Sequence, residues 1–154
     1  MGEMMDGGRR RAEGSGAVAA RRTGTAAPLA SVLIVDDEPM IGTTLRVLLS
    51  GIHEVAVAGS GAAAREMLEE DPGFDLILCD LMMPNVSGME LHAWLNEHNP
   101  DAARRMVFMT GGVFTEDARQ FLEDVPNRRI DKPFDPDDLL RLIDEELMAS
   151  GPAR

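Results

Sequence analysis

The sequence contains one cysteine, no long apolar run and little positive charge. Cys79 cannot form an internal disulfide, and its place within an apolar run predicts a small buried side chain in a reducing compartment. No apolar run approaches the roughly 18 residues that a membrane span needs, and the N-terminus lacks the apolar stretch of a secretory signal. We therefore expect a cytoplasmic protein that makes no contact with a membrane.

The charge balance excludes another class of partner. The 154 residues include 15 Lys and Arg against 27 Asp and Glu, which gives a formal net charge of -12. Such an acidic chain lacks the basic surface that non-specific binding to nucleic acid requires, so we expect no direct nucleic-acid partner. A hydrophobic content of 44% with 27% charged residues is typical of one soluble globular domain.

The composition changes abruptly near residue 30. Residues 1–28 are rich in Gly, Ala and Arg and show neither helical nor strand periodicity, so they are predicted to be a disordered tail or a linker. Residues 29–149 carry the periodic pattern of one folded domain. Residues 150–154 are predicted to be a C-terminal tail.

Short apolar runs alternate with helical patterns throughout residues 29–149. The predicted strands span residues 32–35, 54–58, 76–79, 106–109 and 128–131. The run at 76–79 shows no polar alternation, so both faces of that strand should be covered. Strict alternation of five strands with five helices predicts an α/β fold, a single doubly wound five-stranded parallel sheet in three α/β/α layers.

Four of the predicted strands end in an ionisable or hydroxyl residue. These residues are Asp36 and Asp37 after the first strand, Asp80 after the third, Thr110 after the fourth and Lys132 after the fifth. Because the carboxyl ends of parallel strands share one edge, these side chains should meet there. Three crowded carboxylates repel one another, and a divalent cation and a lysine would relieve that repulsion. Oxygen ligands without clustered Cys or His favour Mg²⁺ over zinc.

This arrangement indicates a phosphoryl acceptor. A carboxylate held against Mg²⁺, with Lys and Thr placed to hold additional oxygens, can act as a nucleophile toward phosphorus. We therefore predict that Asp80 carries a phosphoryl group. The histidines His53, His92 and His98 are not paired with acids at metal spacing, and we predict that all three lie at the surface.

At this point the motifs resemble a known family, the receiver domains of two-component response regulators. The resemblance rests on Val35-Asp36-Asp37, on Asp80-Leu81-Met82-Met83-Pro84 with Gly88, on Thr110-Gly111 and on Lys132-Pro133-Phe134. It covers about residues 31–148, with every motif in order. It implies a flavodoxin-like fold of strand order 2-1-3-4-5 and transfer of a phosphoryl group to Asp80 from the phosphohistidine of a histidine kinase or phosphotransfer domain.

The resemblance also implies metal ligands. Asp37, Asp80 and the backbone carbonyl of Met82 would bind Mg²⁺ directly, and Asp36 would assist through a water molecule. The methionines near these motifs are most simply interpreted as filling of the hydrophobic core.

The last two motif residues would act on the phosphoryl group itself. By the resemblance, Thr110 and Lys132 would bind the phosphoryl oxygens, and the Lys132-Pro133 peptide bond is expected to be cis. One position departs from the family pattern: Arg129 stands three residues before Lys132, where receivers that switch by turning a ring inward commonly carry an aromatic residue. That switch is unavailable here, and our hypothesis is that Arg129 moves between solvent and an acidic partner.

The remaining expectations concern output and partners. The chain ends soon after its last predicted helix, so we expect no output domain and signalling by protein contact or phosphate relay. The runs 106–112 and 127–129 look most like receivers at the C-terminus of hybrid histidine kinases. The expected partners are therefore a histidine kinase or phosphotransfer domain and a downstream protein target, and a homodimer is left open.

Two other functions compete with this interpretation. An aspartyl-phosphate phosphatase or phosphotransferase acting on an external substrate generally needs a second acid two residues after its nucleophile, and Met82 stands there. A degenerate receiver that works without phosphorylation is disfavoured because every motif residue is present. We therefore expect a phospho-acceptor signalling domain rather than an enzyme.

Overall fold

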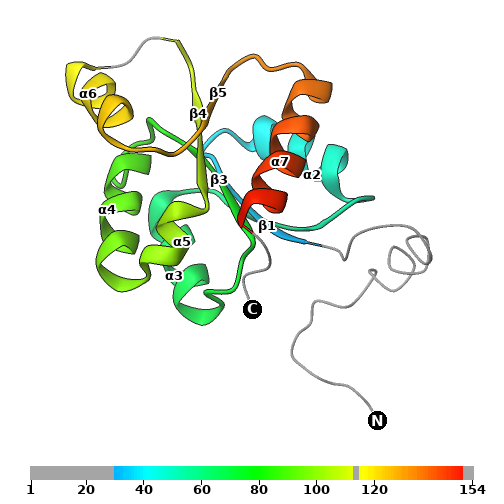
Figure 1. Cartoon of the computed structure of the whole chain (residues 1–154), viewed down its shortest axis with the longest axis horizontal. Helices are drawn as coiled ribbons and strands as arrows, with labels where there is room; N and C mark the ends of the chain where they lie inside the picture. Colours follow the sequence, from blue (N-terminus) through cyan, green and yellow to red (C-terminus); the bar gives the residue numbers. More distant parts are fainter. Residues whose placement is uncertain (1–29, 113–114, 151–154) are drawn as a thin grey trace.

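The structure is a computed structural model that describes residues 30–112 and 115–150 (Figure 1). The predicted tail of residues 1–28 lies outside the described residues, as do residues 151–154 of the predicted C-terminal tail. Within the described part, no helix is both long and apolar enough to cross a membrane.

Five parallel strands form one sheet in the order β2-β1-β3-β4-β5, as predicted. The strands are β1 (Ser31–Val35), β2 (Glu54–Ala58), β3 (Leu76–Asp80), β4 (Met106–Thr110) and β5 (Arg129–Asp131). The register places Val35 beside Cys79 and Asp80 beside Met109. The carboxyl ends of β1, β3 and β4 therefore lie next to one another, where the predicted site residues follow.

The described residues include six helices, of which five lie between strands and the last follows β5. They are α2 (Pro39–Leu49), α3 (Gly61–Glu70), α4 (Gly88–His98), α5 (Pro100–Arg104), α6 (Glu116–Asp124) and α7 (Pro136–Ser150). The short helix α5 was not predicted. It starts directly after α4 because Pro100 occupies its first turn and the Asn99 side chain accepts a hydrogen bond from the backbone N–H of Ala102.

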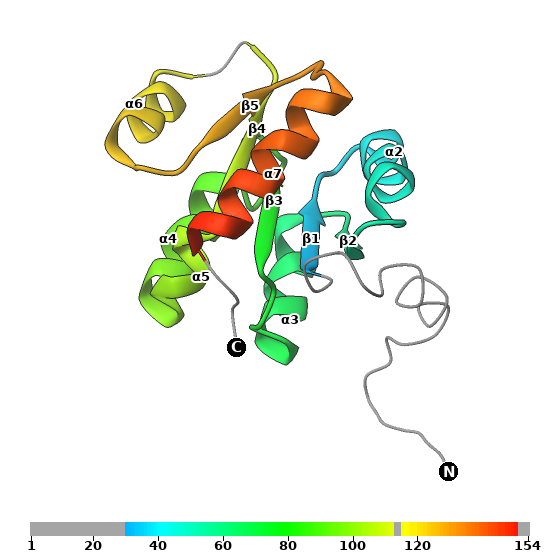
Figure 2. The same cartoon turned by 45° about the vertical axis from the view of Figure 1, so that its right-hand side comes forward.

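Both faces of the sheet are covered by helices (Figures 1 and 2). On one face, α3, α4, α5 and α6 pack against inward-facing residues such as Leu33, Ile77 and Phe108. On the other face, α2 and α7 pack against residues such as Ile34 and Leu78. All five residues of β3 are buried, which confirms the prediction made from its continuous apolar run.

Two predictions about individual side chains were wrong. His53 and His92 are only 7% and 8% exposed, whereas a surface position was expected for both. The His92 ring packs 5.3 Å from the ring of Phe121 and 5.9 Å from that of Phe108, because α6 covers this side of α4. Met82 is also an exception to the predicted filling of the core by methionine, since it is 39% exposed.

Candidate functional site

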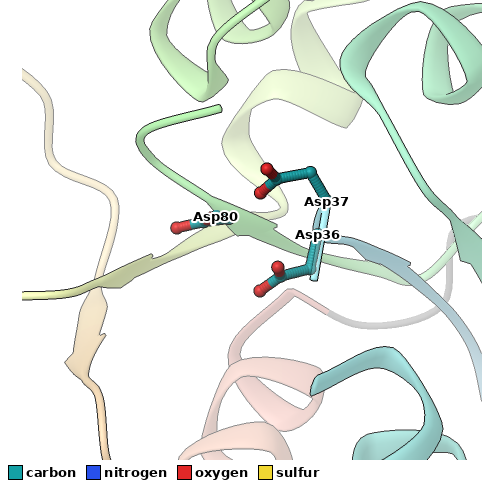
Figure 3. Close-up of side chains that lie close together, drawn as sticks. All are labelled: Asp36, Asp37 and Asp80. Carbon is teal, nitrogen blue, oxygen red and sulfur yellow. The ribbon is translucent and has the colours of Figure 1, made fainter. Parts of the chain in front are cut away.

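Three carboxylates meet at the carboxyl ends of β1 and β3 (Figure 3). Asp36 and Asp37 directly follow β1, and Asp80 is the last residue of β3. One oxygen from each carboxylate lies within 4.8 Å of the others. Asp36 and Asp80 are buried, while Asp37 is the most exposed of the three. The structure thus brings together the acids that the sequence placed at the strand ends.

Lys132 extends from the end of β5 into this acidic cluster. Its Nζ lies 3.1 Å from Asp36 Oδ2, 3.5 Å from Asp80 Oδ1 and 3.6 Å from Glu38 Oε1. The sequence predicted that Lys132 meets the acids at this edge, Asp80 among them, and the contact with Glu38 was not predicted. The Lys132-Pro133 peptide bond is cis, as expected.

The loops around the acids have local causes in the sequence. Asp36 Oδ1 accepts a hydrogen bond of 2.8 Å from the backbone N–H of Glu38, which fixes the turn from β1 into α2. A Cβ at Gly88 would lie 2.6 Å from the backbone oxygen of Asp80 and 3.0 Å from the Cα of Leu81. Only glycine therefore allows the start of α4 to approach the end of β3 this closely.

Burial and like charge control the ionisation of the central acid. Burial, with the neighbouring charge of Asp36, raises the pKa of Asp80 from 3.8 to about 6, although Lys132 opposes the shift. Burial alone would lower the pKa of Lys132, but its hydrogen bond to Asp36 and the nearby negative charges raise it. One ammonium therefore faces several carboxylates, and the cluster retains an excess of negative charge.

The donor set fits a hard divalent cation. All three clustered ligand atoms are carboxylate oxygens, which Mg²⁺ prefers, and the exposure of Asp37 leaves room for the water molecules that Mg²⁺ usually keeps. A cavity of about 350 Å³, lined by Asp36, Asp37, Glu38 and Arg46 among others, opens beside the cluster. The direct ligand role of the Met82 carbonyl stays a prediction.

The neighbouring thiol does not belong to the reactive groups. Cys79 is fully buried in β3, as predicted. Burial, together with the charges of Asp80 and Asp36, holds the pKa of the Cys79 thiol far above its ordinary value. A group that stays protonated is a poor nucleophile and a poor metal ligand.

Thr110 lies at the end of β4 and is almost completely buried. Its hydroxyl donates a hydrogen bond of 2.6 Å to Oδ1 of Asp131, the residue beside it on β5. The sequence analysis assigned no role to Asp131. The available signal was an acid directly before Lys132, but the contact depends on strand register, which the sequence pattern alone did not specify.

Comparison with known proteins identifies the class to which this fold and site belong. The response regulator receiver domain family matches residues 32–144, which include all five strands except the first residue of β1 and every acid and lysine of the site. The chain belongs to this family, which makes it a receiver domain of two-component systems.

Curated relatives agree with this assignment. The chain is 33% identical over 121 residues to the response regulator receiver protein CpdR of Brucella abortus, a match that covers 77% of this chain and 97% of CpdR. It is 30% identical over 116 residues to the nitrate/nitrite response regulator NarL of Escherichia coli, a match that covers 74% of this chain but only 53% of NarL. The match to the Synechocystis response regulator Rre1 likewise spans 49% of that protein.

Solved structures show the same fold. A CheY-like response regulator receiver domain protein from Methanospirillum hungatei superposes with a TM-score of 0.71 at 28% identity, and the match covers 80% of this chain and 97% of that one. A receiver domain protein from Clostridium thermocellum gives a TM-score of 0.70 at 25% identity.

Proposed function

We propose that Asp80 accepts a phosphoryl group from the phosphohistidine of a histidine kinase or phosphotransfer domain, in a reaction that requires Mg²⁺. The observation that carries this proposal is the position of Asp80. Its carboxylate lies within reach of two further acids and 3.5 Å from the ammonium of Lys132. A carboxylate with both a cation and further metal-binding acids beside it can act as a nucleophile toward phosphorus.

The transfer step forms one bond and breaks one. An oxygen of Asp80 bonds to phosphorus while the bond between phosphorus and the donor imidazole breaks. The imidazole nitrogen keeps the electron pair and takes up a proton from water. Lys132 needs little movement to hold a phosphoryl oxygen, since its Nζ already contacts Asp80. When bound by the acids, Mg²⁺ supplies positive charge to the phosphoryl oxygens.

Thr110 links phosphorylation of Asp80 to a change at the protein surface. Once a phosphoryl group is present, its hydroxyl turns toward a phosphoryl oxygen, and the face made by α6, β5 and α7 shifts between two states. We propose that protein partners read this face. Arg129 is exposed on β5, where it is placed to meet an acidic partner. If an Arg129→Ala variant kept full phosphorylation-dependent partner binding, this part of the proposal would be wrong.

We further propose that the protein acts in the cytoplasm as a phospho-acceptor and turns over no external substrate. Its own chemistry is then limited to transfer onto Asp80 and hydrolysis of the resulting acyl phosphate. Protein contact or onward phosphate relay is the proposed output.

Labelling tests the proposed function. Incubation with Mg²⁺ and acetyl phosphate should give about one phosphoryl group per chain, stable to acid and labile to base. Asp80→Asn should abolish the label, whereas Asp144→Asn, which removes an exposed acid on α7, should leave it unchanged. Absence of label on the wild-type chain would indicate a degenerate receiver, and multiple turnover of small phosphate esters would indicate an enzyme.

A further inference from the structure

Thr110 and Asp131 are directly opposite each other on neighbouring parallel strands. The register of β4 and β5 pairs these two residues, and the Thr110 Oγ1 to Asp131 Oδ1 distance is 2.6 Å. A bond of this length from a hydroxyl to a carboxylate is charge-assisted and among the stronger hydrogen bonds in proteins. A threonine hydroxyl has one proton, so this bond uses its whole capacity as a donor.

The neighbouring lysine does not neutralise Asp131. The Nζ of Lys132 contacts Asp36, Asp80 and Glu38. Asp131 itself forms no ion pair with any residue in 30–112 or 115–150. The Thr110 hydroxyl is therefore the hydrogen-bond donor that the structure assigns to this carboxylate.

We propose that Asp131 is a positioning residue that retains the Thr110 hydroxyl before phosphoryl transfer and so opposes the phosphorylated state. This inference rests on the proposed function, in which the same hydroxyl must bind a phosphoryl oxygen on Asp80. Its single proton cannot serve both acceptors. Each phosphorylation event therefore has to break the bond between Thr110 and Asp131.

The location of Asp131 suits such a role. β5 is a three-residue strand at the edge of the sheet, and Asp131 is exposed, whereas Thr110 is 2% exposed. When the hydroxyl leaves, water can solvate the exposed carboxylate. The bond is thus strong enough to hold the Thr110 hydroxyl in the unphosphorylated protein. It is also weak enough for the hydroxyl to exchange Asp131 for a phosphoryl oxygen.

Beryllium fluoride is a phosphoryl analogue that binds an aspartate together with Mg²⁺. The affinity of the protein for this analogue measures how strongly Asp131 opposes the phosphorylated state. Asp131→Val removes the acceptor and suits an edge strand. It should bind the analogue roughly three- to tenfold more tightly than the wild type, the size expected for one lost hydrogen bond. Thermal unfolding of each variant checks that the fold is retained.

A double-mutant cycle separates the hydrogen bond from the charge of Asp131. Thr110→Val removes the hydroxyl and keeps the shape of the side chain. In that background, Asp131→Val should change the affinity by less than about twofold, because no hydroxyl remains to be released. Equal tightening in both backgrounds would overturn the inference, since the acid would then act only through its charge.

A second measurement needs neither metal nor phosphoryl analogue. Three-bond NMR couplings of the Thr110 methyl group report its χ1 angle in the unmodified protein. One rotamer is expected for the wild type, and averaging between rotamers is expected for Asp131→Val. An unchanged single rotamer in the variant contradicts the inference.

These experiments distinguish the two proposals. If the wild type takes label on Asp80 but Asp131→Val binds the analogue no more tightly, the inference about Asp131 fails and the proposed function stands. If the wild type takes no label, the proposed function fails, and the role of Asp131 in opposing phosphorylation fails with it.

Discussion

The two halves of the site are built differently. The acids lie at the carboxyl ends of β1 and β3, central strands in which nearly every residue is buried. Thr110, Asp131 and Lys132 lie instead where β4 meets β5, and β5 is a short edge strand with mostly exposed residues. One half thus holds the proposed nucleophile and the proposed metal ligands. The other half carries Thr110, whose hydrogen bond to Asp131 would have to change in the proposed phosphorylation.

This difference has a physical basis. A central strand has neighbours on both sides and helices on both faces, so its displacement disturbs many packed side chains. A three-residue edge strand has one neighbour and little buried area, so its movement affects few contacts. The proposed function, which requires a bound metal and a response to phosphorylation, would benefit from both kinds of support.

The largest expected effect compares the two halves by stability. Leu78→Ala in β3 removes a fully buried side chain and should lower the free energy of unfolding by about 2 to 5 kcal/mol. Ile130→Ala in β5 removes a half-buried one and should lower it by less than half as much. Urea denaturation measures both. Equal losses would show that the edge is as firmly packed as the centre.

Metal binding should depend on the acid half alone. Mg²⁺ at about 100 times its Kd should add roughly 2.7 kcal/mol to the free energy of unfolding of the wild type. Asp37→Asn should remove most of this stabilisation, because it deletes a proposed metal ligand, and a chelator should reverse the wild-type gain. Asp131→Asn serves as the control from the other half and should retain the gain. Thermal melts with and without Mg²⁺ measure this stabilisation. If Asp131→Asn also lost it, both halves of the site would contribute to metal binding.

The smallest effect concerns His92 of α4, whose ring packs against that of Phe121 on α6. Burial lowers the pKa of His92, although a hydrogen bond with Asn127 opposes the shift. Below the ordinary His pKa of about 6.5, His92 is protonated more readily in the unfolded chain than in the folded one. The contribution of His92 to the free energy of unfolding therefore decreases as the pH falls.

The test of this prediction replaces the ring. Between about pH 7 and pH 5, the melting temperature of His92→Phe should fall less, or rise more, than that of the wild type, because the raised pKa of Asp80 acts in the opposite sense in both proteins. Hydrogen exchange should locate the wild-type loss in α6, because the His92 ring packs 5.3 Å from that of Phe121. A loss spread evenly over the sheet would contradict the prediction that the effect of His92 is local.

Much of this architecture was predictable from local patterns. The apolar run ending at Asp80 identified a strand covered on both faces, and the order of elements determined the parallel sheet. Because parallel strands end at one edge, the meeting of Asp36, Asp37, Asp80 and Lys132 followed from their positions after strands.

Most of the missed features depend on contacts between distant segments. His92 lies on the same face of α4 as Leu91 and Leu95, but the rings that pack against it, Phe108 and Phe121, come from two other elements. Glu38 contacts Lys132, which lies far away in the sequence, and no periodic pattern predicts such a contact. Helix α5 depends on one cap residue and one proline, too short a signal for a periodic prediction.

The sequence by itself determined which strands are buried, that they run parallel and which side chains lie at their ends. These properties follow from the spacing of apolar residues and from the geometry of strands joined through helices. Only the tertiary structure decided that the Thr110 hydroxyl bonds to Asp131 and that the Lys132 ammonium is shared among three acids. Hydrogen bonds require distances near 3 Å, and such distances are fixed by strand register and side-chain packing.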